Sequence, residues 1–550
     1  MSWRFLALLA LISTTAWPVA AYADSDQLGK INHIVVIYEE NHSFDNLYGG
    51  WEGVNGLANA DAAHTLQVGQ TTGAYACLLQ NDVNLTSPPL PGDCTDTTTG
   101  TAFVTHFTNA PFGIEAFIPA SARTCPPPGV FAPNGLPASP SNLPGGCTRD
   151  LVHRFYQEQY QLNAGAQNRY VTGSDAVGLA MGYYNTQALP IYVYLHGDGH
   201  PHYAISDAFF QSAFGGSFLN HQWLIAAATP TWPGAPAAQH SIIDSNGMPN
   251  TYALYHPTGP VLDRALTQVC PSLVPGRACG DYSVNTIQPA FQPFRGSPQL
   301  PAQTGATIGD RLSAAGVSWA WYSGGWSNAA GDAGAPGWTN GTGPACSDPD
   351  STANPAWPFC PNKVFQFHHQ PFNYYAAYAP GTPGRTHLRD EQEFIQRANA
   401  SSKTCMLNSV SFVKPVGLEN EHPGYTSTSR GSHHLVELLQ AIQNSSCRKD
   451  TMIVVTYDEF GGQWDHVTPP GQGGASGPHD LWGPGTRIPA LIVSPHLRGT
   501  FVVDHTQYDT TSILATIEHR FGLAALSPRD AAVNDLGRVF TAENPFEDND

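Results

Sequence analysis

The stretch MIVVTYDE, residues 452–459, ends a run of apolar residues with two adjacent carboxylates. A second stretch far away in the chain, IVVIYEEN at residues 34–41, ends in the same way with two glutamates and an asparagine. Short apolar runs bounded by polar residues are typical of fully buried strands. Because parallel strands collect their carboxyl ends in one crevice, we expect these two sets of polar side chains to meet there.

The segments between and after these two predicted strands favour an alternation of helices and strands. Residues 150–163 have helical spacing of apolar positions, and residues 307–323 indicate a helix stopped by a glycine and followed by a strand. Residues 487–496 and 510–523 continue as strand and helix. This alternation predicts an α/β fold with a mostly parallel central sheet and helices on both faces.

Composition limits the organisation of the chain and its partners. The 550 residues exceed the usual size of one core, and the 54 glycines and 46 prolines indicate long ordered loops. We expect one domain over residues 24–550, with loop-like insertions near 55–148, 229–300 and 325–362, which are rich in Pro and Gly. A net charge of -19 repels phosphate backbones and argues against a nucleic-acid-binding surface.

The first 23 residues have the features of a cleaved secretory signal. They combine a basic residue, an apolar centre and the small-x-small ending Ala21-Tyr22-Ala23. The ten cysteines then predict up to five disulfides in an oxidising space, whose pairing the sequence leaves open. A thiolate metal site is the alternative, but no CxxC spacing supports it. We expect a secreted or periplasmic protein without a membrane-spanning segment beyond the leader.

The acidic ends of the two predicted strands indicate a cation site. Carboxylates that are brought together repel one another unless a cation or protons intervene, so Glu40, Asn41, Asp458 and Glu459 predict one bound divalent metal ion. Oxygen ligands suit Mg²⁺, Ca²⁺ or Mn²⁺, and nearby histidines leave Zn²⁺ or iron open. The alternative is that these side chains cap the helices that follow each strand.

A serine after two glycines, Ser217 in AFGGSFLNH, is the candidate nucleophile. It precedes a predicted helix, so its hydroxyl would be exposed among backbone N–H groups that favour an anion. The alternative is an ordinary helix N-cap. The GxSxG pattern of α/β-hydrolases is absent.

Histidines supply the remaining candidates, because imidazolium can hold an anion and protonate a leaving oxygen. For any one of them the alternative is a hydrogen-bonded structural residue. We expect His433 and His434, which lie on a regular helical stretch, to be structural. The candidates are His153, on the first predicted helix, and His368, His369 and His422.

The chain resembles the bacterial acid phosphatase/phospholipase C superfamily, whose fold is similar to that of alkaline phosphatase and sulfatase. Matching segments occur in the family's order, among them IVVIYEENHSFDNLYGG, SAFGGSFLNH, FHHQPFNYY, NEHPGY and VVTYDEFGGQWDHVTPP. The resemblance implies a nucleophilic Ser217 and no certain role for Asp465 and His466. It implies metal ligation by Glu40, Asn41, Ser217, Asp458 and Glu459. It implies that His153, His368, His369 and His422 surround the phosphate.

By this resemblance the protein is expected to be a secreted, metal-dependent phosphoric ester hydrolase that forms a phosphoserine at Ser217. An acidic pH optimum follows if imidazolium holds the phosphate. A serine nucleophile, a leader without twin arginines and a short carboxyl-terminal segment favour the acid phosphatase branch. A phospholipase C-type phosphodiesterase is the second interpretation, and a non-enzymatic secreted calcium-binding module is the third.

Overall fold

The computed structural model describes residues 25–79, 92–100, 102–116, 150–347, 356–362 and 364–542. Its core is an eight-stranded sheet in which only β16 runs antiparallel to its neighbours, so the predicted mostly parallel α/β fold is confirmed. In spatial order the strands are β13 (Leu388–Asp390), β12 (Trp319–Ser323), β14 (Val410–Lys414), β1 (His33–Glu39), β15 (Thr451–Tyr457), β16 (Ala490–Val493), β8 (Tyr203–Ser206) and β17 (Phe501–Asp504).

The central strand β1 lies between β14 and β15 and is parallel to both. Ile37 pairs with Val413 on one side and with Val455 on the other. Every residue of β14 and β15 is buried, as is all of β1 after its first residue. Burial on both faces explains why these strands read as continuous apolar runs, and the shared direction brings their carboxyl ends to one edge.

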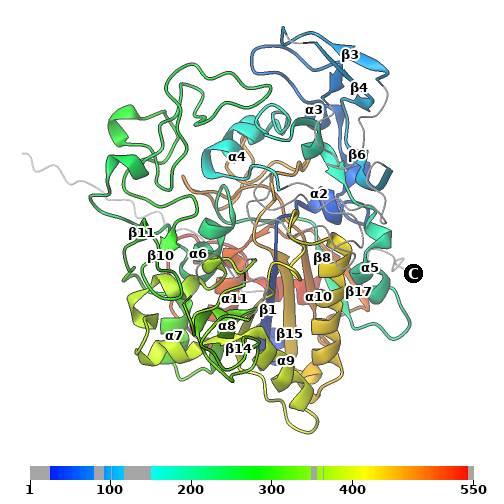
Figure 1. The fold of residues 1–550 in the computed structure, drawn as a ribbon. Helices are drawn as coiled ribbons and strands as arrows, with labels where there is room; N and C mark the ends of the chain where they lie inside the picture. The colour runs from blue at the N-terminus through cyan, green and yellow to red at the C-terminus, as the bar shows by residue number, and fades with distance from the viewer. Residues whose placement is uncertain are drawn as a thin grey trace, which may run out of the picture.

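Helices cover both faces of the sheet (Figure 1). On β12 the Trp319 indole N–H donates to Ser313 of α7 (2.9 Å), whereas the Tyr322 ring packs against Phe394 of α9. Because side chains three apart on a strand point to opposite faces, these two helices lie on opposite sides of the sheet. The helices of the α7 side are α6 (Ser217–Ala226), α7 (Ile308–Ala314) and α11 (Thr511–Phe521), and those of the α9 side are α5 (Pro190–Leu195), α9 (Glu391–Ala400) and α10 (Thr428–Gln443).

The local signals for α7 act as the sequence indicates. Thr307 and Asp310 form a capping box at its start, and Gly316 adopts a φ of 68° just beyond its end. The helix predicted over residues 150–163 is shorter than expected, because α4 runs from Phe155 to Leu162. The placement of His153 on that helix is therefore wrong, since the residue lies in the extended segment before it.

The remaining elements are short and lie mostly outside the central sheet. Among the described residues, no helix has the length and apolar character needed to cross a bilayer. The helices are α1 (Ser25–Leu28), α2 (Phe44–Leu47), α3 (Ala62–Thr65) and α8 (Trp326–Ala330). The strands are β2 (Cys77–Leu78), β3 (Cys94–Asp96), β4 (Phe103–Thr105), β5 (Phe107–Thr108), β6 (Phe112–Gly113), β7 (Gly182–Tyr183), β9 (Phe209–Phe210), β10 (Gln288–Pro289), β11 (Gln299–Leu300) and β18 (Tyr508–Asp509).

Disulfides join cysteines that are neighbours in the sequence. Three bridges lie within the predicted insertions, and the fourth ties the chain before β14 to the turn before β15. The pairs are Cys77–Cys94, Cys270–Cys279, Cys346–Cys360 and Cys405–Cys447. The two other cysteines, at positions 125 and 147, and the predicted signal at 1–23 lie outside the described residues.

A buried ion pair joins α10 to α9 on one face of the sheet. His434 Nε2 lies 2.9 Å from Glu391 Oε1 and 3.8 Å from Glu419 Oε2. Burial alone would lower the pKa of His434, but the two carboxylates outweigh this effect and raise the pKa to about 10. The ring is therefore an imidazolium that links two helices, in agreement with the structural role expected from the sequence.

We expect replacement of His434 by glutamine to reduce the pH dependence of stability. An unfolded histidine loses its proton near pH 6.5, so the ion pair contributes fully below about pH 6.5 and is lost as pH rises towards 10. The measurement is urea unfolding at pH 6.5, 8 and 9.5. The matched control is His433→Gln, an exposed neighbour on the same helix. An equal loss of stability with pH in His434→Gln and wild type would contradict the assignment.

Candidate active site

The carboxyl ends of β1 and β15 meet, as the two apolar runs predict. The backbone N–H of Asn41 donates to Asp458 Oδ1 (3.2 Å), and the N–H of Glu459 donates to the same oxygen (2.8 Å). Asn41 has a φ of 65°, which bends the chain as it leaves β1. The first helix after β1 is capped by Ser43, so Glu40 and Asn41 are not its cap. The helix-capping alternative therefore does not apply to this pair.

Ser217 is the first residue of α6, and its hydroxyl points at both strand ends. Its Oγ lies 3.4 Å from Asn41 Oδ1 and 3.2 Å from Glu459 Oε1, and its one hydrogen can be donated to either oxygen. The N-cap is Gly216, and no side chain caps the helix. Ser217 is therefore not an ordinary capping serine, and its hydroxyl lies among the carboxylates.

The two glycines before Ser217 allow the segment 153–155 to approach closely. Gly215 has a φ of 92°, and a Cβ there would lie 2.5 Å from the backbone N of Phe155. A Cβ on Gly216 would lie 2.9 Å from His153 O. The N–H of Gly215 also donates to the buried carboxyl of Glu158 on α4. The GGS turn therefore fixes the serine and the histidine relative to each other.

His153 and His422 face Asn41 from two sides. Their Nδ1 atoms lie within hydrogen-bonding distance of Leu151 O and Pro423 O. Because a carbonyl oxygen only accepts, each Nδ1 carries the hydrogen, and the neutral ring keeps its lone pair on Nε2. The Nε2 atoms lie 3.5 Å (His153) and 3.1 Å (His422) from Asn41 Nδ2. Both rings can therefore take up a proton on the side that faces the site.

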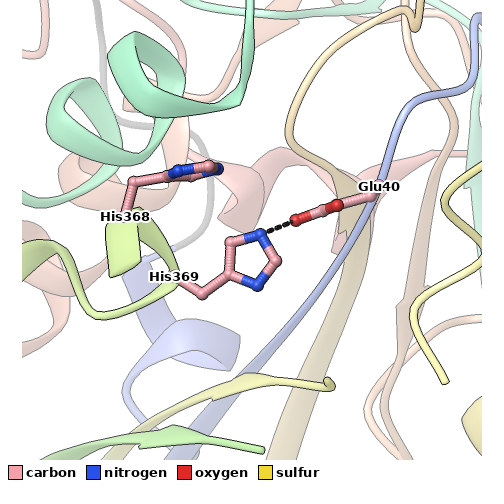
Figure 2. Close-up of side chains that lie close together, drawn as sticks. All are labelled: Glu40, His368 and His369. Carbon is pink, nitrogen blue, oxygen red and sulfur yellow. Dashed lines mark ion pairs between the residues drawn. The ribbon is translucent and has the colours of Figure 1, made fainter. Parts of the chain in front are cut away.

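The neighbouring histidines of the turn Phe367–His369 point in different directions (Figure 2). The Nε2 atom of His369 contacts an oxygen of the Glu40 carboxylate, and the His369 ring stacks on His221. His368 makes no such contact with Glu40 and contributes to the wall of the cavity. His369 therefore lies behind the carboxylate, which differs from the expectation that both rings surround the phosphate.

Burial keeps these histidines neutral at ordinary pH. It lowers the pKa of His422 to about 3 and the pKa of His368 well below its usual value. Burial also lowers the pKa of His153 and His369. The positive charge that we expect from imidazolium is therefore absent near neutral pH unless a bound anion raises these pKa values.

Two residues of the site escape sequence reasoning. Lys414 ends β14 and lies 2.8 Å from Glu40 Oε1 through its Nζ, fully buried. His221 follows Ser217 by one helical turn and lies 3.7 Å from Asp458 Oδ2. The sequence signal for Lys414 was its place at the end of an apolar run. The signal for His221 was its spacing of four residues from Ser217, which puts both on one face of a helix. Neither residue stands out without the geometry of the neighbouring strands.

The site's side chains fit a divalent cation. Glu40 Oε2 and Asp458 Oδ2 are buried and accept no hydrogen bond. Burial, with the neighbouring Glu40, raises the pKa of Asp458 to about 7, and burial with Asp458 raises that of Glu459 well above its usual value. A bound cation would offset both the burial of these carboxylates and their mutual repulsion. Of the predicted ligands, Glu40 and Asp458 lie close enough to share one ion together with His221, and Glu40 with His368 and His369 forms a second such group. Glu459 belongs to neither group and is connected to the site through Ser217.

These groups border a cavity of about 540 Å³. Its near wall contains Glu40, Ser217 and three of the four predicted histidines, His153, His368 and His422. The far wall comes from the predicted insertion at 229–300 and is largely polar. It includes Asn250, Tyr252, Asp263, Arg264 and Asn285. A substrate held at Ser217 would therefore extend towards this insertion.

Asp465 and His466, to which no role could be assigned from the sequence, belong to a buried network beside the site. Arg487 donates through Nη2 to Asp45 Oδ1 (3.0 Å) and through Nε to Asp465 Oδ1 (3.1 Å). His466 Nδ1 contacts the second oxygen of Asp45. The guanidinium thus joins the loop after β1 to the loop after β15. Asp45, Asp465 and His466 are close enough to hold a metal ion, but Arg487 already supplies their cation.

We expect Arg487→Met to lower the free energy of unfolding by about 3–5 kcal/mol, because it leaves two buried carboxylates without their cation. Chemical denaturation at pH 7 measures the loss. Arg498→Met, at an exposed arginine, is the matched control. A denaturation midpoint for Arg487→Met equal to that of the control would show that the network does not depend on the guanidinium.

Comparison with known proteins places this site in a family. The sequence is 24% identical to phospholipase C A of Mycobacterium tuberculosis, over 94% of this chain and 78% of that protein. It is 29% identical to non-specific phospholipase C4 of Arabidopsis thaliana, over 24% of this chain and 27% of that protein. A solved alkaline phosphatase superfamily protein from Vibrio parahaemolyticus matches at 15% identity, over 43% of this chain and 52% of that one. The TM-score of this structural match is 0.22. The match to the phosphoesterase family covers residues 31–524, and the chain therefore belongs to this family.

Proposed function

We propose that the protein hydrolyses phosphoric esters with Ser217 as the nucleophile, acting mainly on phosphomonoesters. The observation that carries the proposal is the position of the Ser217 hydroxyl, at the start of α6 and within 3.4 Å of Asn41 and Glu459. Membership of the phosphoesterase family supports a phosphoric ester as the substrate. Proximity of this hydroxyl to bound phosphate would give a phosphoserine intermediate, which water then hydrolyses.

The chain's own groups divide the work of this reaction. Glu459 and Asn41 are the two acceptors within reach of the Ser217 hydroxyl, and they position its oxygen at the cavity. A divalent cation held by Glu40, Asn41, Ser217, Asp458 and Glu459 would supply the Lewis acidity that lowers the pKa of the hydroxyl. His153, His368 and His422 line the same cavity and are the groups that would give a leaving oxygen its proton.

The histidine tautomers connect phosphate binding to proton uptake. In their neutral forms His153 and His422 present lone pairs, which repel a phosphate oxygen. They donate to phosphate only after Nε2 is protonated, so binding of the anion takes up protons. Because burial lowers both pKa values, protonation requires acidic solution or a bound anion.

Phospholipase C-type hydrolysis of phosphodiesters is the second candidate. It is favoured by the similarity to phospholipase C A of Mycobacterium tuberculosis. The monoester reading is favoured by the polar far wall of the cavity, which offers hydrogen bonds to a hydroxylated leaving group. We also propose export to the periplasm or the exterior, which the four disulfides support.

We expect Ser217→Ala to lower kcat by on the order of 1,000-fold or more while the protein stays folded, because the nucleophile is lost. Steady-state hydrolysis of p-nitrophenyl phosphate measures this loss, and acid quenching of wild type tests for phosphoserine. The matched control is Ser402→Ala, at an exposed serine before β14. Wild-type turnover by a folded Ser217→Ala protein would refute the assignment of Ser217 as the nucleophile.

We expect p-nitrophenyl phosphate to be hydrolysed with higher kcat/KM than p-nitrophenyl phosphorylcholine, and this value to fall as pH rises from 4 to 8. The fall reflects deprotonation of histidines whose pKa values burial lowers. The two substrates are compared on one preparation with saturating metal. Faster hydrolysis of the diester would favour the phospholipase C candidate, and a flat profile would rule out histidine as the proton source.

A further inference from the structure

Lys414 is a buried cation that the reaction scheme above does not use. All of its contacts are fixed by the sheet, because β14 pairs with β1 along its length. Its Nζ donates to the carbonyl oxygens of Tyr38 (3.0 Å) and Glu39 (3.2 Å) and lies 2.8 Å from Glu40 Oε1. The three N–H groups of the ammonium therefore have three oxygen partners.

These contacts hold Lys414 away from the substrate. Its side chain is fully buried, and the residue does not contribute to the wall of the cavity. Two of its three partners are backbone carbonyls of β1, so the ammonium can turn towards a phosphate only by giving up both of these hydrogen bonds. Any effect on the reaction must therefore act through Glu40.

A count of charges indicates what that effect is. The site contains three fully buried carboxylates, on Glu40, Asp458 and Glu459. Among the described residues, Lys414 is the one lysine or arginine within ion-pair distance of any of them. Carboxylates bind a metal in their ionised form, so the metal-binding state has three negative charges and one positive charge from Lys414. The net charge of about -2 matches one divalent ion.

We propose that Lys414 is the permanent counter-cation of the metal site, which holds Glu40 through Oε1 and limits the site's attraction to that of a single divalent ion. The inference rests on the proposed function, because it assumes that the carboxylates bind a metal. The alternative is a purely structural lysine that satisfies the carbonyls of β1.

The two interpretations differ in their effect on metal affinity. Removal of a positive charge a few ångströms from the metal position strengthens the attraction for Mn²⁺, by about tenfold or more. A structural lysine has no such effect, and its loss would misplace Glu40 and weaken binding. The direction of the change in affinity therefore separates them.

The test uses full-length protein freed of metal with a chelator. Mn²⁺ is added, and the unbound ion is followed by electron paramagnetic resonance. We expect wild type to bind one equivalent and Lys414→Met to bind Mn²⁺ at least about tenfold more tightly. Lys414→Arg, which keeps the charge, is the matched control and is expected within about threefold of wild type.

Each outcome of the titration has a separate meaning. Binding of Mn²⁺ by Lys414→Met with unchanged or weaker affinity overturns the role of Lys414 and leaves the metal site intact. Absence of Mn²⁺ binding by wild type contradicts the metal site itself, and with it this part of the proposed function. Thermal unfolding checks that the variants fold. If Lys414→Met shows no cooperative transition, Lys414→Gln, whose amide can still donate to β1, undergoes the same titration with the same expected increase.

Discussion

The burial of three carboxylates at the ends of two parallel strands is the constraint on which the site depends. Glu40, Asp458 and Glu459 are fully buried, and their mutual repulsion has to be offset for the sheet to close. One ammonium, from Lys414, lies within ion-pair distance of Glu40. The strands thus bring together more negative charge than the chain itself neutralises, and a bound cation completes the balance.

A second acidic cluster a short way along the same two loops shows the opposite solution. Asp45 and Asp465 share the guanidinium of Arg487, and His466 supports Asp45. Both clusters have the residue types of a metal site. In one cluster a single forked guanidinium contacts both carboxylates. In the other, Asp458 and Glu459 have no lysine or arginine within ion-pair distance among the described residues. The difference in charge balance, rather than residue type, distinguishes the candidate metal centre from a structural clamp.

Residues that follow recognisable strand patterns could be predicted from the sequence, whereas contacts between distant segments could not. Glu40 and Asp458 follow apolar runs, so the direction of parallel strands was enough to bring them together. Lys414 also ends such a run, but a lysine at the end of a strand is equally expected where the strand reaches solvent. The backbone N–H of Asp45 donates to the carboxylate of Asp465 from 420 residues away, and no local pattern connects the two residues. The orientation of His369 towards Glu40 depends on a 3-10 turn, so its position behind the carboxylate was not visible from its neighbour His368.

Charge balance also determines how this acidic protein can attract an anion. A site with a net charge of -2 that binds one divalent ion becomes neutral, so the metal alone gives a phosphate dianion no excess of positive charge. That excess must come from proton uptake by His153, His368 or His422, and burial opposes this uptake by lowering the pKa of each ring. A bound phosphate would raise these pKa values by its own charge. Substrate binding and protonation are then one coupled step, and preference for acidic solution becomes a property of the whole cavity rather than of any single histidine.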